Sequence, residues 1–327
     1  MPPEDATRST GLGCCPARMG GHAHSGEPAE GKGGRRRGGS RPRYRAVTGV
    51  RSTALMLAAT LAIAGCIGHH PARELLVGSH PDSESVLLGN IYAGALRSYG
   101  FAARVETAPD PVAKLDSGVL NVVPGLTGRL LQTFQPGAMV RSDKQVYRAM
   151  VSALPEGIAA GDYTTAAEDK PALAVTKFTA KAWGGNDLSA LPRHCDGLVV
   201  GSVAGVSTLS AVSRCRLPAA REFPDDATMF AALRAGEVTT AWTTTADPDV
   251  PADLVVLADG KPALVQAENV VPLYRRNELA ARQLLAINEV AGVLDTAALV
   301  EMRRQVIGGA NPQAVADAWL AEHPLGR

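Results

Sequence analysis

Short β-rich runs alternate with helical stretches from residue 74 to residue 323, and this alternation limits the folds that the chain can adopt. The expected strands cover residues 74–79, 101–105, 118–123, 172–176, 197–202, 238–243 and 254–257. The expected helices cover residues 83–100, 112–115, 127–134, 144–154, 179–183, 208–214, 227–235, 278–291, 296–307 and 312–323. Such alternation is typical of an α/β protein with largely parallel sheets. The length of 327 residues predicts about two domains.

Charge is unevenly divided between the N-terminal part of the chain and its body. Residues 1–65 hold ten Lys and Arg against four Asp and Glu. Residues 66–327 hold 23 Lys and Arg against 28 Asp and Glu, a net charge of −5. Nucleic-acid binding depends on a basic surface, so the acidic body argues against a nucleic-acid partner. No apolar run reaches the ~20 residues of a membrane-spanning helix, which argues against a polytopic membrane protein.

The first 65 residues have the composition of a targeting region rather than of a domain. Residues 1–46 are rich in Gly, Arg, Pro and Ser and cannot bury enough apolar surface to fold. We expect them to be disordered or to precede the true start codon. The alternative is that Arg35–Arg37 belongs to a basic nucleic-acid-binding tail.

Residues 47–65 have the order of an export signal, with Arg51 before an apolar run that ends in small residues. The sequence Ile-Ala-Gly-Cys at its end resembles the lipobox of bacterial lipoproteins, in which the Cys becomes the first mature residue and carries lipid. We therefore expect a signal peptide over residues 47–65, lipidation of Cys66 and a linker over residues 66–73. A buried helix with an incidental Cys is the alternative.

Two of the five cysteines, Cys195 and Cys215, lie in the body of the chain. They form an even pair in a protein that we expect outside the cytoplasm, where disulfides form. The bond would close a loop of about 20 residues, which contributes ~3 kcal/mol to stability. Two free buried thiols are the alternative. Neither Cys has a CxxC partner and His194 alone does not complete a ligand set, so we expect no metal site.

The segment VGSHPDSE joins the first expected strand to the first expected helix. Open α/β sheets bind ligands at this carboxyl edge, and the free N–H groups of a helix N-terminus suit a carboxylate. Asp82 or Ser83 is expected to cap the helix. Ser79, His80, Asp82 and Ser83 are therefore candidate ligand-binding residues. A capped turn without a ligand, with His80 exposed to solvent, is the alternative.

Several ordered segments resemble the substrate-binding proteins of osmoprotectant ABC importers, the ProX-like group for glycine betaine, choline and carnitine. They are VGSHPDSES with the following NIYA, VPGLTG at 123–128, KPALAV at 170–175, AWTTT at 241–245, and LVVLAD at 254–259 with NVVP at 269–272. The family has VGSKxFTEQ, PEYTG, YALAV and AYTTD segments at the corresponding places. The order and spacing of the set, over about residues 74–323, carry the resemblance.

The resemblance implies a two-lobe periplasmic-binding-protein fold of type II, with a ligand cleft between the lobes. Lobe one is expected at residues 74–170 plus 260–327, and lobe two at residues 171–259. The implied function is to capture a small polar or quaternary-ammonium solute and to deliver it to ABC permease and ATPase subunits. The protein would be lipid-anchored to the outer face of the bacterial cytoplasmic membrane, and it would be no enzyme and need no cofactor.

Members of this family hold a quaternary ammonium in a box of aromatic rings, through cation–π attraction of ~0.5–2 kcal/mol per ring. Trp242 stands at the Tyr of the AYTT segment and is expected to form one wall, with a core aromatic as the alternative. Leu126 replaces the Tyr of PEYTG, and Pro171 replaces another Tyr, so the box is incomplete. The remaining candidates are Thr127, Asp169, Thr243 and Thr244.

Two other functions are compatible with the sequence. An interaction protein that is lipid-anchored and has lost its ligand would explain the missing box residues. A hydrolase is the second alternative. The chain has no GxSxG, HExxH or Gly-rich phosphate loop, and the few histidines of its body leave little for a catalytic triad.

Overall fold

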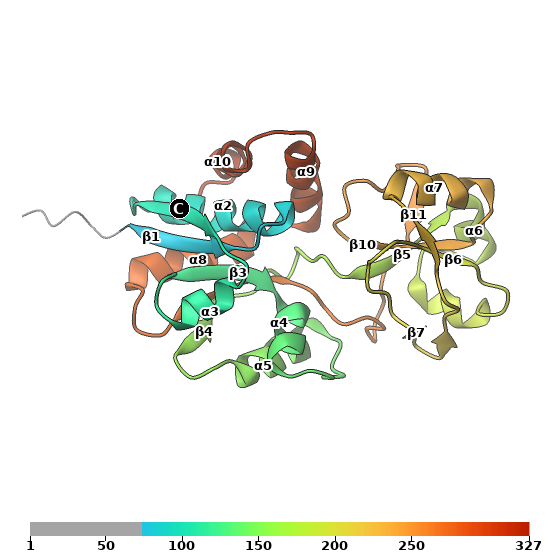
Figure 1. Ribbon diagram of the computed structural model, residues 1–327, viewed down its shortest axis with the longest axis horizontal. Helices are drawn as coiled ribbons and strands as arrows, with labels where there is room; N and C mark the ends of the chain where they lie inside the picture. Colours follow the sequence, from blue (N-terminus) through green and yellow to red (C-terminus); the bar gives the residue numbers. More distant parts are fainter. Residues whose placement is uncertain (1–73, 327) are drawn as a thin grey trace, which may run out of the picture. The chain divides into compact units, whose positions relative to one another are not determined.

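The computed structural model describes residues 74–326 (Figure 1). The expected extension (1–46), signal peptide (47–65), lipidated Cys66 and linker (66–73) lie outside these residues. The described chain forms two five-stranded sheets and one two-stranded hairpin. Each large sheet carries its own helices, and we call each such unit a lobe. The expected two-lobe α/β architecture is therefore confirmed.

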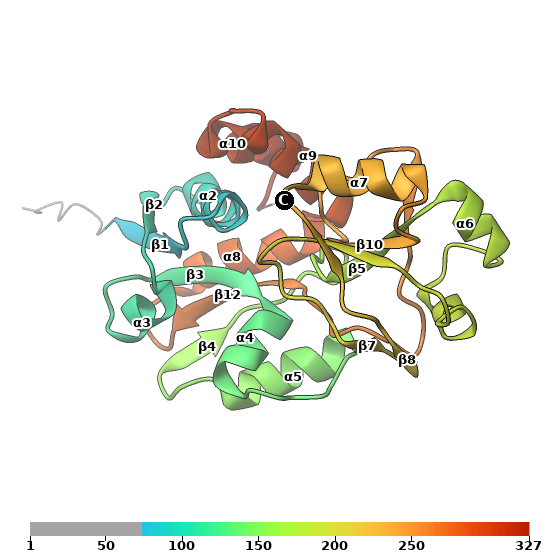
Figure 2. The same ribbon diagram turned by 45° about the vertical axis from the view of Figure 1, so that its right-hand side comes forward.

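The sheet of lobe one has the strand order β2-β1-β3-β12-β4. Its strands are β1 (Leu75–Ser79), β2 (Ala103–Thr107), β3 (Val122–Leu126), β4 (Ile158–Ala160) and β12 (Val270–Arg275). The helices packed with the first apolar core of this lobe are α2 (Ser83–Ser98), α8 (Ala281–Val293), α9 (Thr296–Ile307) and α10 (Pro312–Glu322). Those packed with the second core are α3 (Pro111–Asp116), α4 (Thr127–Phe134) and α5 (Asp143–Ala153). The two helix groups lie on opposite faces of the sheet, with α4 beside α5 (Figures 1 and 2).

The sheet of lobe two has the strand order β11-β5-β10-β6-β9. Its strands are β5 (Pro171–Thr176), β6 (Val200–Val203), β9 (Arg221–Phe223), β10 (Thr240–Thr244) and β11 (Leu254–Val256). Around it lie α6 (Lys177–Ala182), the 3₁₀ helix η1 (Leu188–Arg193), α7 (Asp226–Ala235), and a hairpin of β7 (Ala211–Val212) with β8 (Cys215–Arg216).

The chain passes from one sheet to the other twice, after β4 and after β11. These two crossings contact each other. Glu168 and Asn269 form an isolated antiparallel bridge, and the backbone N–H of Asp169 donates to the carbonyl of Glu268 at 2.9 Å. The paired crossings therefore join the two lobes.

Both sheets are mixed, whereas the sequence predicted largely parallel sheets. In lobe one, β12 runs antiparallel to β3 and β4. In lobe two, β5 runs antiparallel to β10 and β11. The reason is topological: β5 and β12 are the strands that follow the crossings, and each enters a sheet from the other lobe rather than through a helical crossover.

Side-chain caps begin several helices, and the cap that the sequence predicted at Asp82 or Ser83 is Asp82. The carboxylate of Asp82 accepts from the N–H of Ser85 at 2.8 Å, and that of Asp295 accepts from Ala298 at 2.8 Å. Asn311 caps α10, with Pro312 in its first turn. Such caps satisfy N–H groups that have no partner inside the helix.

The prediction of a helix over residues 208–214 is wrong. This stretch ends in the β7–β8 hairpin, whose turn holds Ser213 at a φ of 56°. Val212 and Cys215 are buried in the core of lobe two, so a two-residue turn, not a helical face, brings the apolar side chains inward. The sequence also did not predict β12, because Pro272 interrupts the strand pattern; in the sheet it lies opposite Pro124 of β3.

Cys195 and Cys215 form a disulfide in the structure, 20 residues apart. We expect the double variant Cys195→Ser/Cys215→Ser to lower the free energy of unfolding by about 3 kcal/mol, because the loop gains freedom in the unfolded chain. Urea denaturation measures this loss. A reducing agent should destabilise the wild-type chain by a similar amount and leave the double variant unchanged; equal stability of both proteins would contradict the prediction.

Candidate functional site

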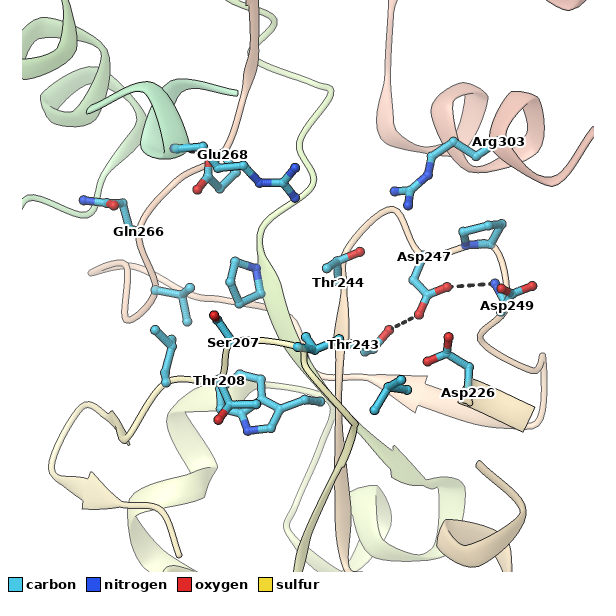
Figure 3. Close-up of a pocket in the computed structure, with 18 of the residues that line it drawn as sticks. Ser207, Thr208, Asp226, Thr243, Thr244, Asp247, Asp249, Gln266, Glu268 and Arg303 are labelled. Carbon is cyan, nitrogen blue, oxygen red and sulfur yellow. Dashed lines mark hydrogen bonds between the residues drawn. The ribbon is translucent and has the colours of Figure 1, made fainter. Parts of the chain in front are cut away.

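A cavity of about 750 Å³ lies between the two lobes. Lobe one contributes Arg129 and Gln132 from α4, Gln266 and Glu268 from the second crossing, and Arg303 and Ile307 from α9. Lobe two contributes the start of β5, residues 206–209 after β6, Asp226 of α7, Trp242–Thr244 of β10 and residues 247–249 (Figure 3). The cavity therefore lies between the carboxyl end of β10 and the side chains of Arg129 and Gln132 on α4.

Trp242 belongs both to the cavity wall and to the core of lobe two. It is only 6% exposed, and β10 places it opposite Leu173 of β5. It shares an apolar cluster with Leu173 and Val265. Of the described residues that line the cavity, it is the only aromatic one.

Three aspartates lie on the lobe-two side of the cavity. The Oδ2 atom of Asp247 accepts from the hydroxyl of Thr243 at 2.6 Å, and its Oδ1 atom accepts from the N–H of Asp249 at 2.9 Å (Figure 3). Asp226 is the first residue of α7. Its partial burial and the negative charges of Asp247 and Asp249 raise the pKa of Asp226. Burial is the larger cause of this shift, and the neighbouring aspartate charges reinforce it.

On the lobe-one side, two arginines are held by buried carboxylates. Arg129 Nη1 lies 3.2 Å from Oε2 of Glu84, and Arg129 Nη2 lies 3.6 Å from Oδ2 of Asp169. Arg303 Nη1 lies 3.1 Å from the same Asp169 oxygen and donates to the carbonyl of Ala246 at 2.8 Å. This cluster ties α4 and α9 to the first crossing and to the loop after β10.

Two glutamates of this cluster have strongly raised pKa values. Burial, reinforced by the charge of Asp169, raises the pKa of Glu84 to about 7. Burial raises the pKa of Glu268 to about 7, although the backbone N–H and the charge of Arg129 oppose the shift. Three carboxyl groups face two guanidinium groups here, so partial protonation of Glu84 and Glu268 reduces the excess negative charge of the cluster.

A smaller cavity of about 330 Å³ adjoins the first, and Arg129 lines both. It lies at the carboxyl end of β3. Its walls include His80 from the turn after β1, Glu84 from the start of α2, Leu126 at the end of β3 and Leu130 on α4.

The candidate residues from the sequence divide between these places. Trp242, Thr243 and Thr244 line the large cavity, and His80 and Leu126 line the small one. Asp169, 1% exposed, lies behind Arg129 and Arg303.

Four further candidates line neither cavity. The hydroxyl of Ser79 lies 3.2 Å from that of Thr107, Asp82 caps α2, and Ser83 is the first residue of that helix. The buried hydroxyl of Thr127 accepts from the N–H of Asn269 at 3.0 Å. Thr127 thus holds the start of α4 against the second crossing.

Sequence reasoning missed the charged residues of the cavity. Arg129 directly follows the VPGLTG segment, and its place next to that segment is the one local sign that it lies near the cavity. Asp226 starts a helix, where an acidic residue is ordinary. Nothing local distinguishes Asp247 or Arg303, because the fold brings them together from distant parts of the chain.

The sequence matches the OpuAC family, the substrate-binding domain of ABC-type glycine betaine transport systems, over residues 73–322. A crystal structure of a glycine betaine/carnitine/choline ABC transporter protein is similar, with a TM-score of 0.65 and 18% identity, over 76% of this chain and 98% of that one. Apo YehZ from Escherichia coli has a TM-score of 0.63 and 20% identity, over 77% of this chain and 99% of that one. A search of curated protein sequences finds no match.

The chain therefore belongs to the OpuAC family. It is a substrate-binding component of an ABC importer, not an enzyme, and this class works outside the cytoplasm with a permease and an ATPase. The periplasmic-binding-protein fold that the resemblance implied is confirmed.

Two negative findings concern residues 74–326 only. No single helix there is long and apolar enough to cross a membrane; α8 and α9 meet that test only as a pair, across a bend of 99°. In the same range, no three His, Cys, Asp or Glu side chains are grouped to hold a metal ion.

The raised pKa values predict a pH-dependent stability. Glu84 and Glu268 bind protons more tightly in the folded chain than in the unfolded one, so the free energy of unfolding falls as pH rises from about 4.5 to about 7. Glu84→Gln removes one titrating group. The free energy of unfolding, measured by urea denaturation, should fall less between pH 5 and pH 8 in Glu84→Gln than in the wild type, by on the order of 3 kcal/mol.

Glu301→Gln is the matched control. Side-chain donors on Gln305 and Arg304 lower the pKa of the exposed Glu301 carboxyl, so this carboxyl stays ionised above pH 5. Glu301→Gln should therefore leave the dependence of the free energy of unfolding on pH between 5 and 8 unchanged. Identical slopes for the wild type and Glu84→Gln would show that the burial of Glu84 does not control the titration.

Proposed function

We propose that the cavity between the lobes captures a small polar or quaternary-ammonium solute, of the glycine betaine, choline and carnitine class, for delivery to a permease. The observation that carries the proposal is the large cavity with Trp242 in its wall and carboxylates beside it. An indole face attracts a cationic nitrogen by ~0.5–2 kcal/mol, more when water is excluded. The neighbouring Asp226 and Asp247 add Coulombic attraction for the same group.

The two crossings support a binding cycle by hinge motion. They are the two covalent links between the lobes, and they pair with each other at Glu168 and Asn269. In two-lobe proteins, such links absorb the backbone rotation when the lobes close on a ligand. A solute that contacts Trp242 on one side and Arg129 or Gln266 on the other stabilises the closed state by the difference in its contacts.

Trp242→Leu tests the site. Leu keeps an apolar side chain in the core of lobe two but removes the aromatic face and the indole N–H. We expect at least a tenfold weaker binding of cationic solutes by isothermal titration calorimetry, equivalent to about 1.4 kcal/mol, with a folded chain by circular dichroism.

Trp183→Leu is the control, because Trp183 stacks on His194 with ring centroids 5.0 Å apart and lines only a separate surface pocket. Its variant should bind as the wild type does. If Trp242→Leu also binds as the wild type does, the cavity is not the solute site. If the wild type binds no solute of the class, an interaction protein that has lost its ligand becomes the better explanation.

We further propose that the mature protein is anchored to the outer face of the cytoplasmic membrane through lipid on Cys66. The support is the order of positive residue, apolar run and small residues before Cys66 in the sequence. Two or more acyl chains on one residue give stable anchoring, whereas one chain is marginal.

Mass spectrometry of the native protein checks this anchor. We expect a lipid-modified N-terminal peptide that begins at Cys66 and no peptides from residues 1–65. Cys66→Ser should move the protein from the membrane fraction to the soluble or unprocessed fraction. Recovery of peptides from residues 1–40 in the native protein would overturn the expected processing.

A further inference from the structure

Arg303 of α9 brings hydrogen-bond donors to the cavity wall that the described part of the chain does not use. Its Nη1 atom donates to the carbonyl of Ala246 at 2.8 Å and lies 3.1 Å from Oδ2 of Asp169. Its Nε atom is buried and has no hydrogen-bond partner among residues 74–326. Buried donors without a partner are rare in proteins, and they are costly when they belong to a charged group. A solute in the cavity can supply the partner.

The geometry of the guanidinium group indicates which chemical group fits. Nε–H and one N–H of Nη2 point the same way from the planar group, and this fork matches the two oxygens of a carboxylate. Nη1 makes the contacts with Asp169 and Ala246, which hold the guanidinium and leave the fork to a ligand. The side chain of Arg303 keeps 17% of its surface exposed, and Figure 3 shows it extending from α9 toward the cavity.

A hydroxyl group of lobe two lies close to this arginine. The Oγ1 atom of Thr244 is buried without a hydrogen-bond partner in the described residues, and Thr244 lines the same cavity. Thr244 precedes by two residues Ala246, whose carbonyl accepts from Arg303. A carboxylate that accepts from Arg303 can therefore also accept from this hydroxyl. Two unused polar groups, one from each lobe, thus favour the same kind of ligand atom.

The other wall of the cavity suits the opposite end of such a solute. Trp242 offers an aromatic face, and Asp226 and Asp247 add negative charge on lobe two. Both attract a quaternary nitrogen. Choline presents that nitrogen with a neutral hydroxyl, so it cannot pair with the fork of Arg303. A betaine carries a carboxylate as well and has a partner for each wall.

We propose that Arg303 and Thr244 hold the carboxylate of a zwitterionic solute, so that the cleft prefers a betaine to a cation without a carboxylate. The proposal rests on the proposed function, because it assigns one end of the solute in the same cavity. Arg303 belongs to lobe one and Thr244 to lobe two, so a carboxylate between them stabilises the closed arrangement of the lobes.

Calorimetry of the purified full chain with glycine betaine, its amide and choline tests the proposal. The amide replaces the carboxylate by a neutral carboxamide and keeps the quaternary ammonium. We expect glycine betaine to bind more tightly than either cation by about tenfold or more, because only glycine betaine accepts charge-assisted bidentate hydrogen bonds. A preference below about threefold over the amide or choline would overturn the proposal and leave the proposed function intact. If none of the three binds, both are wrong.

Arg303→Gln then locates the effect. It removes the fork, so glycine betaine should bind more weakly by about tenfold or more, while choline binding changes by less than about threefold. Arg104→Gln is the control, because the exposed Arg104 pairs with Glu74 at 3.0 Å and lines neither cavity. This control should bind both solutes as the wild type does. Equal losses for both solutes in folded Arg303→Gln would show that Arg303 only supports the structure, and would overturn the proposal.

Thr244→Val covers the case in which Arg303→Gln does not fold. Valine keeps the shape of threonine and removes the hydroxyl, so glycine betaine should bind more weakly by about threefold or more, with choline binding unchanged. Circular dichroism checks the folding of each variant. An unchanged ratio of the two affinities in folded Thr244→Val would contradict the proposal.

Discussion

The pairing of the two crossings is the interaction on which the rest of the structure depends. Glu168 bridges Asn269, the N–H of Asp169 donates to Glu268 at 2.9 Å, and Thr127 accepts from Asn269 at 3.0 Å. The start of α4, the end of β3 and both links to lobe two meet at this point. These contacts hold α4, which lines the cavity with Arg129 and Gln132, against the links that lead to lobe two.

The same point carries most of the buried charge in the cleft. Asp169 is 1% exposed, accepts from the N–H of Ala246 at 3.0 Å and pairs with Arg303. An isolated buried carboxylate is costly, and pairing with hydrogen bonds offsets that cost. With pKa values of about 7, Glu84 and Glu268 are each partly protonated near neutral pH, which reduces the excess negative charge of the cluster. The lobes are thus joined by a charge network whose balance includes a proton.

The sequence predicted the features that depend on residues close together in the chain, such as helix caps and strand ends. Asp82 caps the helix that it precedes, and the AWTTT segment does end at the cavity. Long-range effects could not be predicted in this way. Pro272 lies within the inner strand β12, opposite Pro124 of β3, and the strand pattern around a proline gives no sign of this pairing. Arg303 reaches the cavity from α9, a helix whose own sequence gives no sign of a binding site. The charged residues that line the cavity come from five separate segments, so no window of the sequence contains the pattern.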